Sequence, residues 1–122
     1  MPPAAAINRQ QEPKAIHMEL NEAAQYCEAG WNVYAKAHGI GRDDVFYLLK
    51  LQEELGELTR RFLELRQQES PADTAKLRDK FAGDCASVVG NALILASHFG
   101  VNLESQLRAK FAVRDWKPGD AT

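Results

Sequence analysis

The sequence lacks any long hydrophobic run. No apolar segment reaches the roughly 18 to 20 residues that a membrane-spanning helix needs. The N-terminus also has no basic stretch followed by an apolar one, which is the pattern of a secretory signal. We therefore expect a cytoplasmic protein.

Cysteine and histidine are scarce as well. Cys27 and Cys85 lie far apart and form no CxxC pair, so we expect buried thiols in a reducing compartment. The three histidines, His17, His38 and His98, are isolated, and no HExxH or Cys/His ligand spacing occurs. A zinc site is therefore not expected.

Several familiar enzyme signatures are missing. The sequence has no GxxxxGK[ST] phosphate loop and no GxSxG elbow. A formal net charge of -2 gives no general attraction to nucleic acid or to an anionic membrane, so any binding must come from a local site. With 122 residues, of which 45% are hydrophobic, the chain can build one domain around one core.

No segment alternates convincingly with period two, so we predict an all-α fold without a sheet. Residues 1–14 contain three prolines and no sustained periodicity, which predicts a mobile N-terminal tail. We predict a single all-α domain over residues 15–117 and a C-terminal tail over residues 118–122.

Helix formers and helix breakers divide this domain into four predicted helices, at about residues 15–38, 44–69, 72–99 and 103–114. Asp43 or Asp44 can cap the second helix, and Ser70 with Pro71 ends it. We expect a four-helix bundle in which the second and third helices form a long antiparallel hairpin. Gly83 and Gly90 inside the third helix each cost up to about 1 kcal/mol, which indicates close packing against a neighbouring backbone.

Six apolar residues share one face of the second helix at about 100° per residue, and we expect this stripe to contact the core: Leu48, Leu51, Leu55, Leu58, Phe62 and Leu65. Glu54 falls at the border of the stripe, Glu57 about 60° further round, and Glu53 further towards solvent. Glu54 and Glu57 are therefore surface neighbours that can close on one divalent cation.

The same charges also fit a plainer interpretation. Lys50 precedes Glu54 by four residues and Arg61 follows Glu57 by four. An exposed ladder of helix ion pairs would account for them, at roughly a few tenths of a kcal/mol each.

Asp84 lies near the middle of an apolar face of the third helix, among Leu77, Phe81, Val88, Leu95 and Phe99. A carboxylate there is desolvated, so it should be paired, protonated or bound to metal. If the two helices pack through their stripes, Asp84 meets Glu54 and Glu57, and the three acids favour a cation. The alternative is Asp84 bonded to Lys50, Lys80 or a backbone group.

The run Glu53-Glu54-Leu55-Gly56-Glu57, followed by Asp84 in a helix rich in small residues, resembles the MazG-like, all-α nucleoside triphosphate pyrophosphohydrolases. The resemblance extends over about residues 44–117. It implies magnesium-dependent hydrolysis of a nucleoside triphosphate to nucleoside monophosphate and pyrophosphate. It further implies that Glu54, Glu57 and Asp84 hold Mg²⁺, with Glu53 and Glu54 as the catalytic candidates.

The sequence departs from the family pattern at two places. Phe81 stands where the family has a glutamate, three residues before Asp84. In the late Lys-x3-Asn-x2-Arg pattern Lys110 fits, while Arg114 and Lys117 replace the last two residues. The candidate substrate-binding residues are Lys50, Arg61, Lys80, Asn91, Lys110, Arg114 and Lys117.

The third helix is apolar or small on nearly every side between residues 81 and 101. One chain of this size can hardly cover it, so we predict a homodimer or homotetramer with this helix at the interface. Trp31 and Tyr34 could stack on a base, although aromatics at helical spacing are more often core. The alternative function is a non-catalytic MazG-like oligomer used for nucleotide sensing or protein association.

Overall fold

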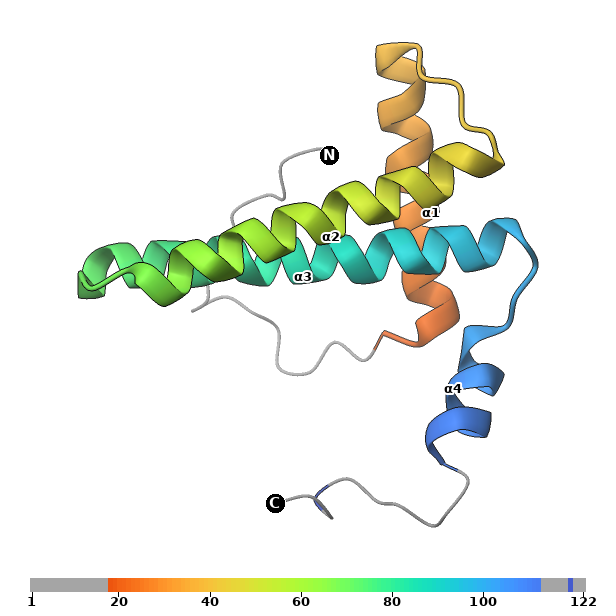
Figure 1. Ribbon diagram of the computed structural model, residues 1–122. Helices are drawn as coiled ribbons and strands as arrows, with labels where there is room; N and C mark the ends of the chain where they lie inside the picture. Colours follow the sequence, from red (N-terminus) through yellow and green to blue (C-terminus); the bar gives the residue numbers. More distant parts are fainter. Residues whose placement is uncertain (1–17, 113–118, 120–122) are drawn as a thin grey trace.

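The computed structural model describes residues 18–112 and Gly119, and this part of the chain is all-α, with four helices and no strand. The helices are α1 (Leu20–His38), α2 (Asp44–Gln67), α3 (Pro71–His98) and α4 (Leu103–Phe111) (Figure 1). The all-α prediction is confirmed. The predicted N-terminal tail lies outside the described residues.

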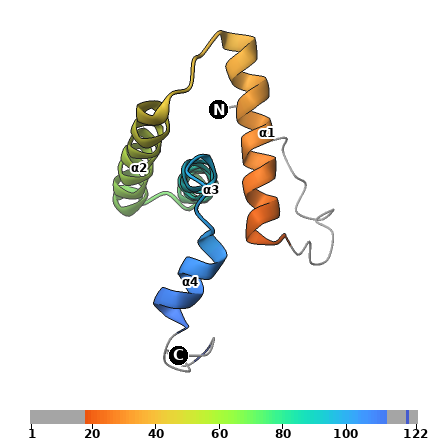
Figure 2. The same ribbon diagram turned by 90° about the vertical axis from the view of Figure 1, so that its right-hand side faces the viewer.

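Helices α2 and α3 form the antiparallel hairpin that was predicted, and they lie side by side along most of their length (Figures 1 and 2). Two contacts fix their register. The Tyr47 ring stacks on His98 with 4.2 Å between centroids, and Arg61 bonds to Asp84 further along. In both contacts the two residue numbers add up to the same value, so each α2 residue from Tyr47 to Gln67 has a definable level on α3, between His98 and Arg78.

Helix α1 crosses the hairpin steeply and packs against α3 on the side away from α2 (Figure 2). Helix α4 projects from the end of α3 and contacts α1. The four helices do not run side by side, so the predicted four-helix bundle is not confirmed.

The core lies where α1 meets the hairpin. The buried apolar residues are Trp31, Ala35, Tyr47, Leu93 and Ile94. The Trp31 ring meets Tyr34 and Phe46 edge-on, at 5.2 and 5.8 Å between centroids, which confirms Trp31 as a core residue. None of the described residues 48–86 is buried, so the distal half of the hairpin has no core of its own.

Local capping residues place the helix ends. The side chain of Asp43 accepts a bond from the Phe46 amide at 2.8 Å and starts α2. Ser70 accepts from the Asp73 amide at 3.4 Å, so α3 begins at Pro71, slightly before the predicted start. Gly39, with φ of 62°, ends α1 as expected.

The apolar stripe of α2 faces α3 only in part, which corrects the prediction that all of it contacts the core. Leu51, Leu58 and Leu65 are half-buried, whereas the side of the stripe made by Leu48, Leu55 and Phe62 is 49, 51 and 44% exposed. A single neighbouring helix covers only one flank of so wide a stripe.

The two interior glycines of α3 differ. A Cβ on Gly90 would lie 3.1 Å from the Cys27 sulfur, whereas one on Gly83 would meet no atom within 4 Å. Close packing is therefore found at Gly90, against the Cys27 side chain instead of the predicted backbone, and the prediction is wrong at Gly83. Cys27 and Cys85 are half-buried free thiols, and burial raises the pKa of the Cys27 thiol.

Among the described residues, no single helix is both long and apolar enough to cross a membrane. Taken together, α3 and α4 are long and apolar enough to cross one, by length and composition alone, but they are bent by 112° relative to each other.

Candidate functional site

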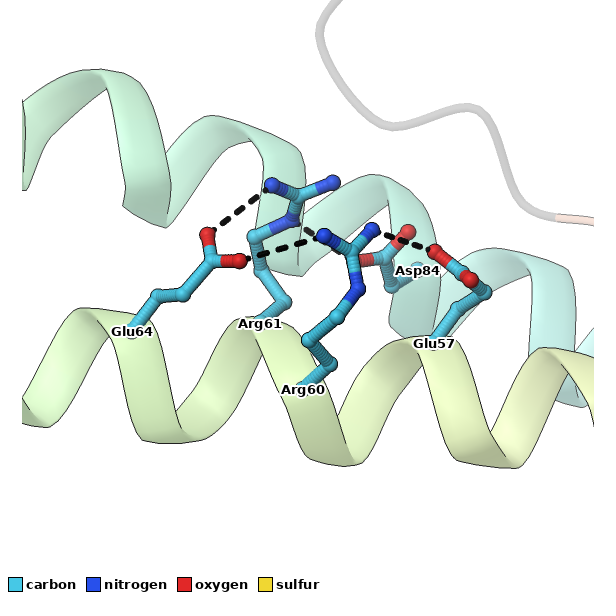
Figure 3. Close-up of polar contacts among 5 residues, drawn as sticks. All are labelled: Glu57, Arg60, Arg61, Glu64 and Asp84. Carbon is cyan, nitrogen blue, oxygen red and sulfur yellow. Dashed lines mark hydrogen bonds and ion pairs between the residues drawn. The ribbon is translucent and has the colours of Figure 1, made fainter.

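Two arginines and three carboxylates form one polar cluster on the hairpin (Figure 3). We call it the arginine–carboxylate cluster, and its members are Glu57, Arg60, Arg61, Glu64 and Asp84. Four of them come from three consecutive turns of α2, and Asp84 reaches them from α3.

The contacts run as a chain from α2 to α3. Arg60 donates to Glu57 at 2.7 Å and to one oxygen of Glu64 at 3.2 Å. Arg61 donates from Nη1 to the other oxygen of Glu64 and from Nε to Oδ2 of Asp84, both at 3.2 Å. Each carboxylate of the cluster is therefore bonded to a guanidinium.

Electrostatics couple all five groups. The hydrogen bond and the charge of Arg60 lower the pKa of Glu57. Glu57 in turn raises the pKa of Arg60, and the charge of Asp84 adds a smaller contribution of the same sign. Asp84 is thus within electrostatic reach of Arg60 although the structure records no bond between them. Three carboxylates and two guanidiniums leave a formal charge of one negative unit.

The side chains of the cluster become more exposed with distance from the contact between α2 and α3. The side chains of Arg61 and Asp84 are 16 and 20% exposed. Those of Arg60 and Glu57 are 57 and 47% exposed. A solvated ligand can therefore reach Glu57 and Arg60 directly, whereas the contact between Arg61 and Asp84 is shielded.

The structure does not bring the predicted carboxylate triad together: each of the three acids is paired with a different basic residue. Asp84 lies level with Arg61, so Glu57 is displaced from it by about one turn, or roughly 6 Å along the axis, and Glu54 by about two turns, or roughly 10 Å. Glu54 is directed to Lys50, 3.8 Å away. The described residues contain no group of three His, Cys, Asp or Glu side chains that could hold a metal ion.

The ion pairs differ in part from those predicted. The pair between Lys50 and Glu54 is confirmed, and Lys50 also bonds Glu53 at 3.3 Å. Glu57 pairs with Arg60 at a spacing of three, instead of with Arg61 at a spacing of four. Arg61 instead turns into the seam.

Asp84 is paired, as expected for a carboxylate that is only 20% exposed, and its partner is Arg61. The predicted alternative partners, Lys50, Lys80 or a backbone group, are wrong. The register of the hairpin places Arg61 opposite Asp84 instead.

The other candidate residues lie apart from the cluster or at its edge. Asn91 is buried, and its amide donates to the Ser87 carbonyl of the same helix at 2.7 Å. Lys80 lines a depression near the closed end of the hairpin together with Glu64. Lys110 is on α4, beyond the other end of α3. Arg114 and Lys117 lie outside the described residues.

Arg60 and Glu64 are cluster members that the sequence analysis missed. Their signal is present in the sequence, because Glu57, Arg60 and Glu64 follow each other at spacings of three and four. Those spacings put the three side chains on one side of α2.

The donor set can be compared with what magnesium requires. Mg²⁺ is usually held by one or two carboxylates together with water and substrate phosphates. Glu57 and Asp84 supply two carboxylates from facing helices, both near Arg60. The described residues offer no enclosed set of three protein carboxylates, so a magnesium ion at this place would have to arrive with a triphosphate.

No protein-family model matches this chain, and no curated protein or solved structure matches it. Membership of the MazG-like family therefore stays a prediction.

Proposed function

We propose that this chain hydrolyses nucleoside triphosphates to nucleoside monophosphate and pyrophosphate in a magnesium-dependent reaction at the arginine–carboxylate cluster. The observation that carries the proposal is that Glu57 and Asp84 come from facing helices and are bonded to two adjacent arginines, Arg60 at 2.7 Å and Arg61 at 3.2 Å. Such a convergence of acids and arginines suits a charged, metal-bound phosphate chain. A cytoplasmic location stays a prediction.

Glu57 and Asp84 are the residues that would hold magnesium. When bound, magnesium neutralises the triphosphate and activates a water for cleavage between the α and β phosphates. Glu53 and Glu54 lie within 4 Å of Lys50 about one turn before Glu57, and they are the candidates for orienting that water.

The two arginines would exchange partners when substrate binds. Without substrate their guanidiniums satisfy Glu57, Glu64 and Asp84. When the carboxylates bind a cation instead, the N–H donors of the two arginines are released. A guanidinium can then donate two parallel hydrogen bonds to phosphate oxygens. Arg60, being the more exposed, is the first contact for the phosphate chain, and Arg61 is the second.

A second candidate function is the non-catalytic oligomer, used for nucleotide sensing or protein association. It is favoured by Phe81, which stands where the family pattern has a carboxylate. The Phe81 ring lies 6.3 Å from that of Phe62, so this position packs against α2.

A pyrophosphate-release assay with a panel of canonical and modified nucleoside triphosphates, with and without magnesium, separates the two. We expect release by the native chain, a loss of about tenfold or more for Asp84→Asn, and no loss for Glu104→Gln. Glu104 is a matched control because it pairs with Arg108 on the separate helix α4. Absence of release, with no thermal shift on adding magnesium and nucleotide, would reject the hydrolase.

A further inference from the structure

The hairpin has an apolar face on the side opposite the arginine–carboxylate cluster. On the wheel of α2, Leu48, Leu55 and Phe62 lie about 80° to 120° from Glu54 in one direction. The α2 members of the cluster lie on the other side of Glu54. We call the stripe of Leu48, Leu55 and Phe62, with Phe81 packed beside it, the apolar face.

No described helix covers this face along the distal hairpin. Helix α1 lies on the other flank, as shown by the Lys50 ammonium 5.1 Å from the centre of the Trp31 ring. Exposed apolar stripes of this length are unfavourable in water and are normally buried against another element. Because none of residues 48–86 is buried, the distal hairpin needs an external partner to form a core.

The stripe is arranged so that it matches itself. Asp44 and Arg66 lie on the same arc, within about 40°, as the three apolar residues. Leu48 and Phe62 are each seven residues from Leu55, and Asp44 and Arg66 are each eleven residues from it. If the stripe is reversed about Leu55, Leu48 and Phe62 therefore exchange places. Asp44 and Arg66 exchange places in the same way.

This symmetry identifies a second copy of the chain as the partner. In an antiparallel contact with its two-fold axis at Leu55, each Asp44 faces the Arg66 of the other copy. Within its own chain Asp44 lies 2.7 Å from Nε2 of His98, and because its side chain is 71% exposed, a second partner can still reach it. Leu48 then faces Phe62, and Leu55 meets its own equivalent. Two-fold dimers use the same patch on both subunits, and seven-residue spacing suits packing between helices. A parallel contact would instead place like charges together.

We propose that two copies dock through the apolar face, α2 against α2 with the two-fold axis at Leu55, and so form a bundle of two hairpins. This inference does not rest on the proposed hydrolase, because the face lies opposite the cluster. It also places the interface on α2. The sequence predicted an interface on the third helix, where Leu93 is buried within the chain but Val89 is 55% exposed, and that prediction stays untested.

A cysteine cross-link tests the axis directly. The native chain should scatter light as a particle of twice 13.6 kDa. Under mild oxidation Leu55→Cys should form a covalent dimer, because residues on the axis approach within disulfide range. Leu49→Cys is the matched control, being 55% exposed on the same helix but turned away from the face. The native chain, with Cys27 and Cys85, gives the background.

A charge reversal provides the second arm. Arg66→Asp should weaken dimerisation by about tenfold, and adding Asp44→Arg should restore it. Circular dichroism shows whether each variant remains helical. A native chain that is monomeric at micromolar concentration would overturn the proposal. So would a dimer in which Leu55→Cys fails to link or links no better than Leu49→Cys.

Discussion

Arg61 of α2 donates a hydrogen bond from Nε to Oδ2 of Asp84 on α3, at 3.2 Å across the seam of the hairpin. Both side chains are largely shielded from solvent. The pair neutralises the acid that the sequence placed on an apolar face, and it ties Asp84 to the α2 arginines of the cluster. The stability of the hairpin and the chemistry of the cluster therefore depend on the same contact.

Replacing Asp84 by Asn should destabilise the chain by about 1 to 2 kcal/mol, because the shielded Arg61 guanidinium loses its charged partner. Urea unfolding followed by circular dichroism measures the change. The control Glu104→Gln breaks an exposed pair with Arg108 and should cost at most about 0.5 kcal/mol. Equal effects in the two variants would mean that the Arg61–Asp84 contact does not stabilise the fold.

The ion pair of Glu57 should respond to acid in a defined direction. Arg60 lowers the pKa of Glu57 in the folded chain. The stabilisation that this ion pair gives the fold is therefore fully present above the pKa that Glu57 has in the unfolded chain. It is lost as the pH falls through the lower pKa that Glu57 has in the folded chain. Carboxyl carbon NMR should show Glu57 titrating below the usual glutamate range and moving upward in Arg60→Gln. An unchanged titration in that variant would rule out Arg60 as the cause.

The two glycines inside α3 should respond differently to alanine. Gly83→Ala should stabilise the chain by about 0.5 to 1 kcal/mol, because alanine favours helix and nothing obstructs the new Cβ. Gly90→Ala should gain less or lose stability, since its Cβ would lie 3.1 Å from the Cys27 sulfur. Thermal unfolding of both variants checks the order. Gly90→Ala as the more stable variant would contradict the packing.

The start of α2 depends on one cap. Asp43→Ala should cost about 0.5 to 2 kcal/mol, because the Phe46 amide loses the carboxylate it donates to at 2.8 Å. Asp43→Asn keeps an acceptor and should retain most of the stability. Urea unfolding of the pair of variants separates the cap from a general charge effect, for which alanine and asparagine would be equally costly.

Local sequence was enough to predict the four helices, because their boundaries are local chemistry. Asp43 and Ser70 act as caps, and Gly39 takes the left-handed conformation that ends α1. Some ends differ from the prediction: α2 stops at Gln67, with Gln68 as its C-cap, and α1 begins at Leu20, with Glu19 as its N-cap.

The flank of α2 that faces α3 could not be predicted from periodicity alone. The stripe from Leu48 to Leu65 is wider than one neighbour can cover, and only the hairpin register decides that Leu55 stays exposed. The same register decides the partner of Asp84. That this acid needed a partner follows from its position among apolar residues, but choosing Arg61 requires knowing which α2 residue lies level with it.

Binding of magnesium together with a non-hydrolysable nucleoside triphosphate analogue, measured by titration calorimetry, tests the central claim most directly. The account predicts binding that needs both components, is weakened about tenfold or more by Glu57→Gln and by Asp84→Asn, and is unchanged by Glu104→Gln. Binding that is absent from the native chain, or that survives both cluster substitutions, would contradict a magnesium–triphosphate site at the arginine–carboxylate cluster.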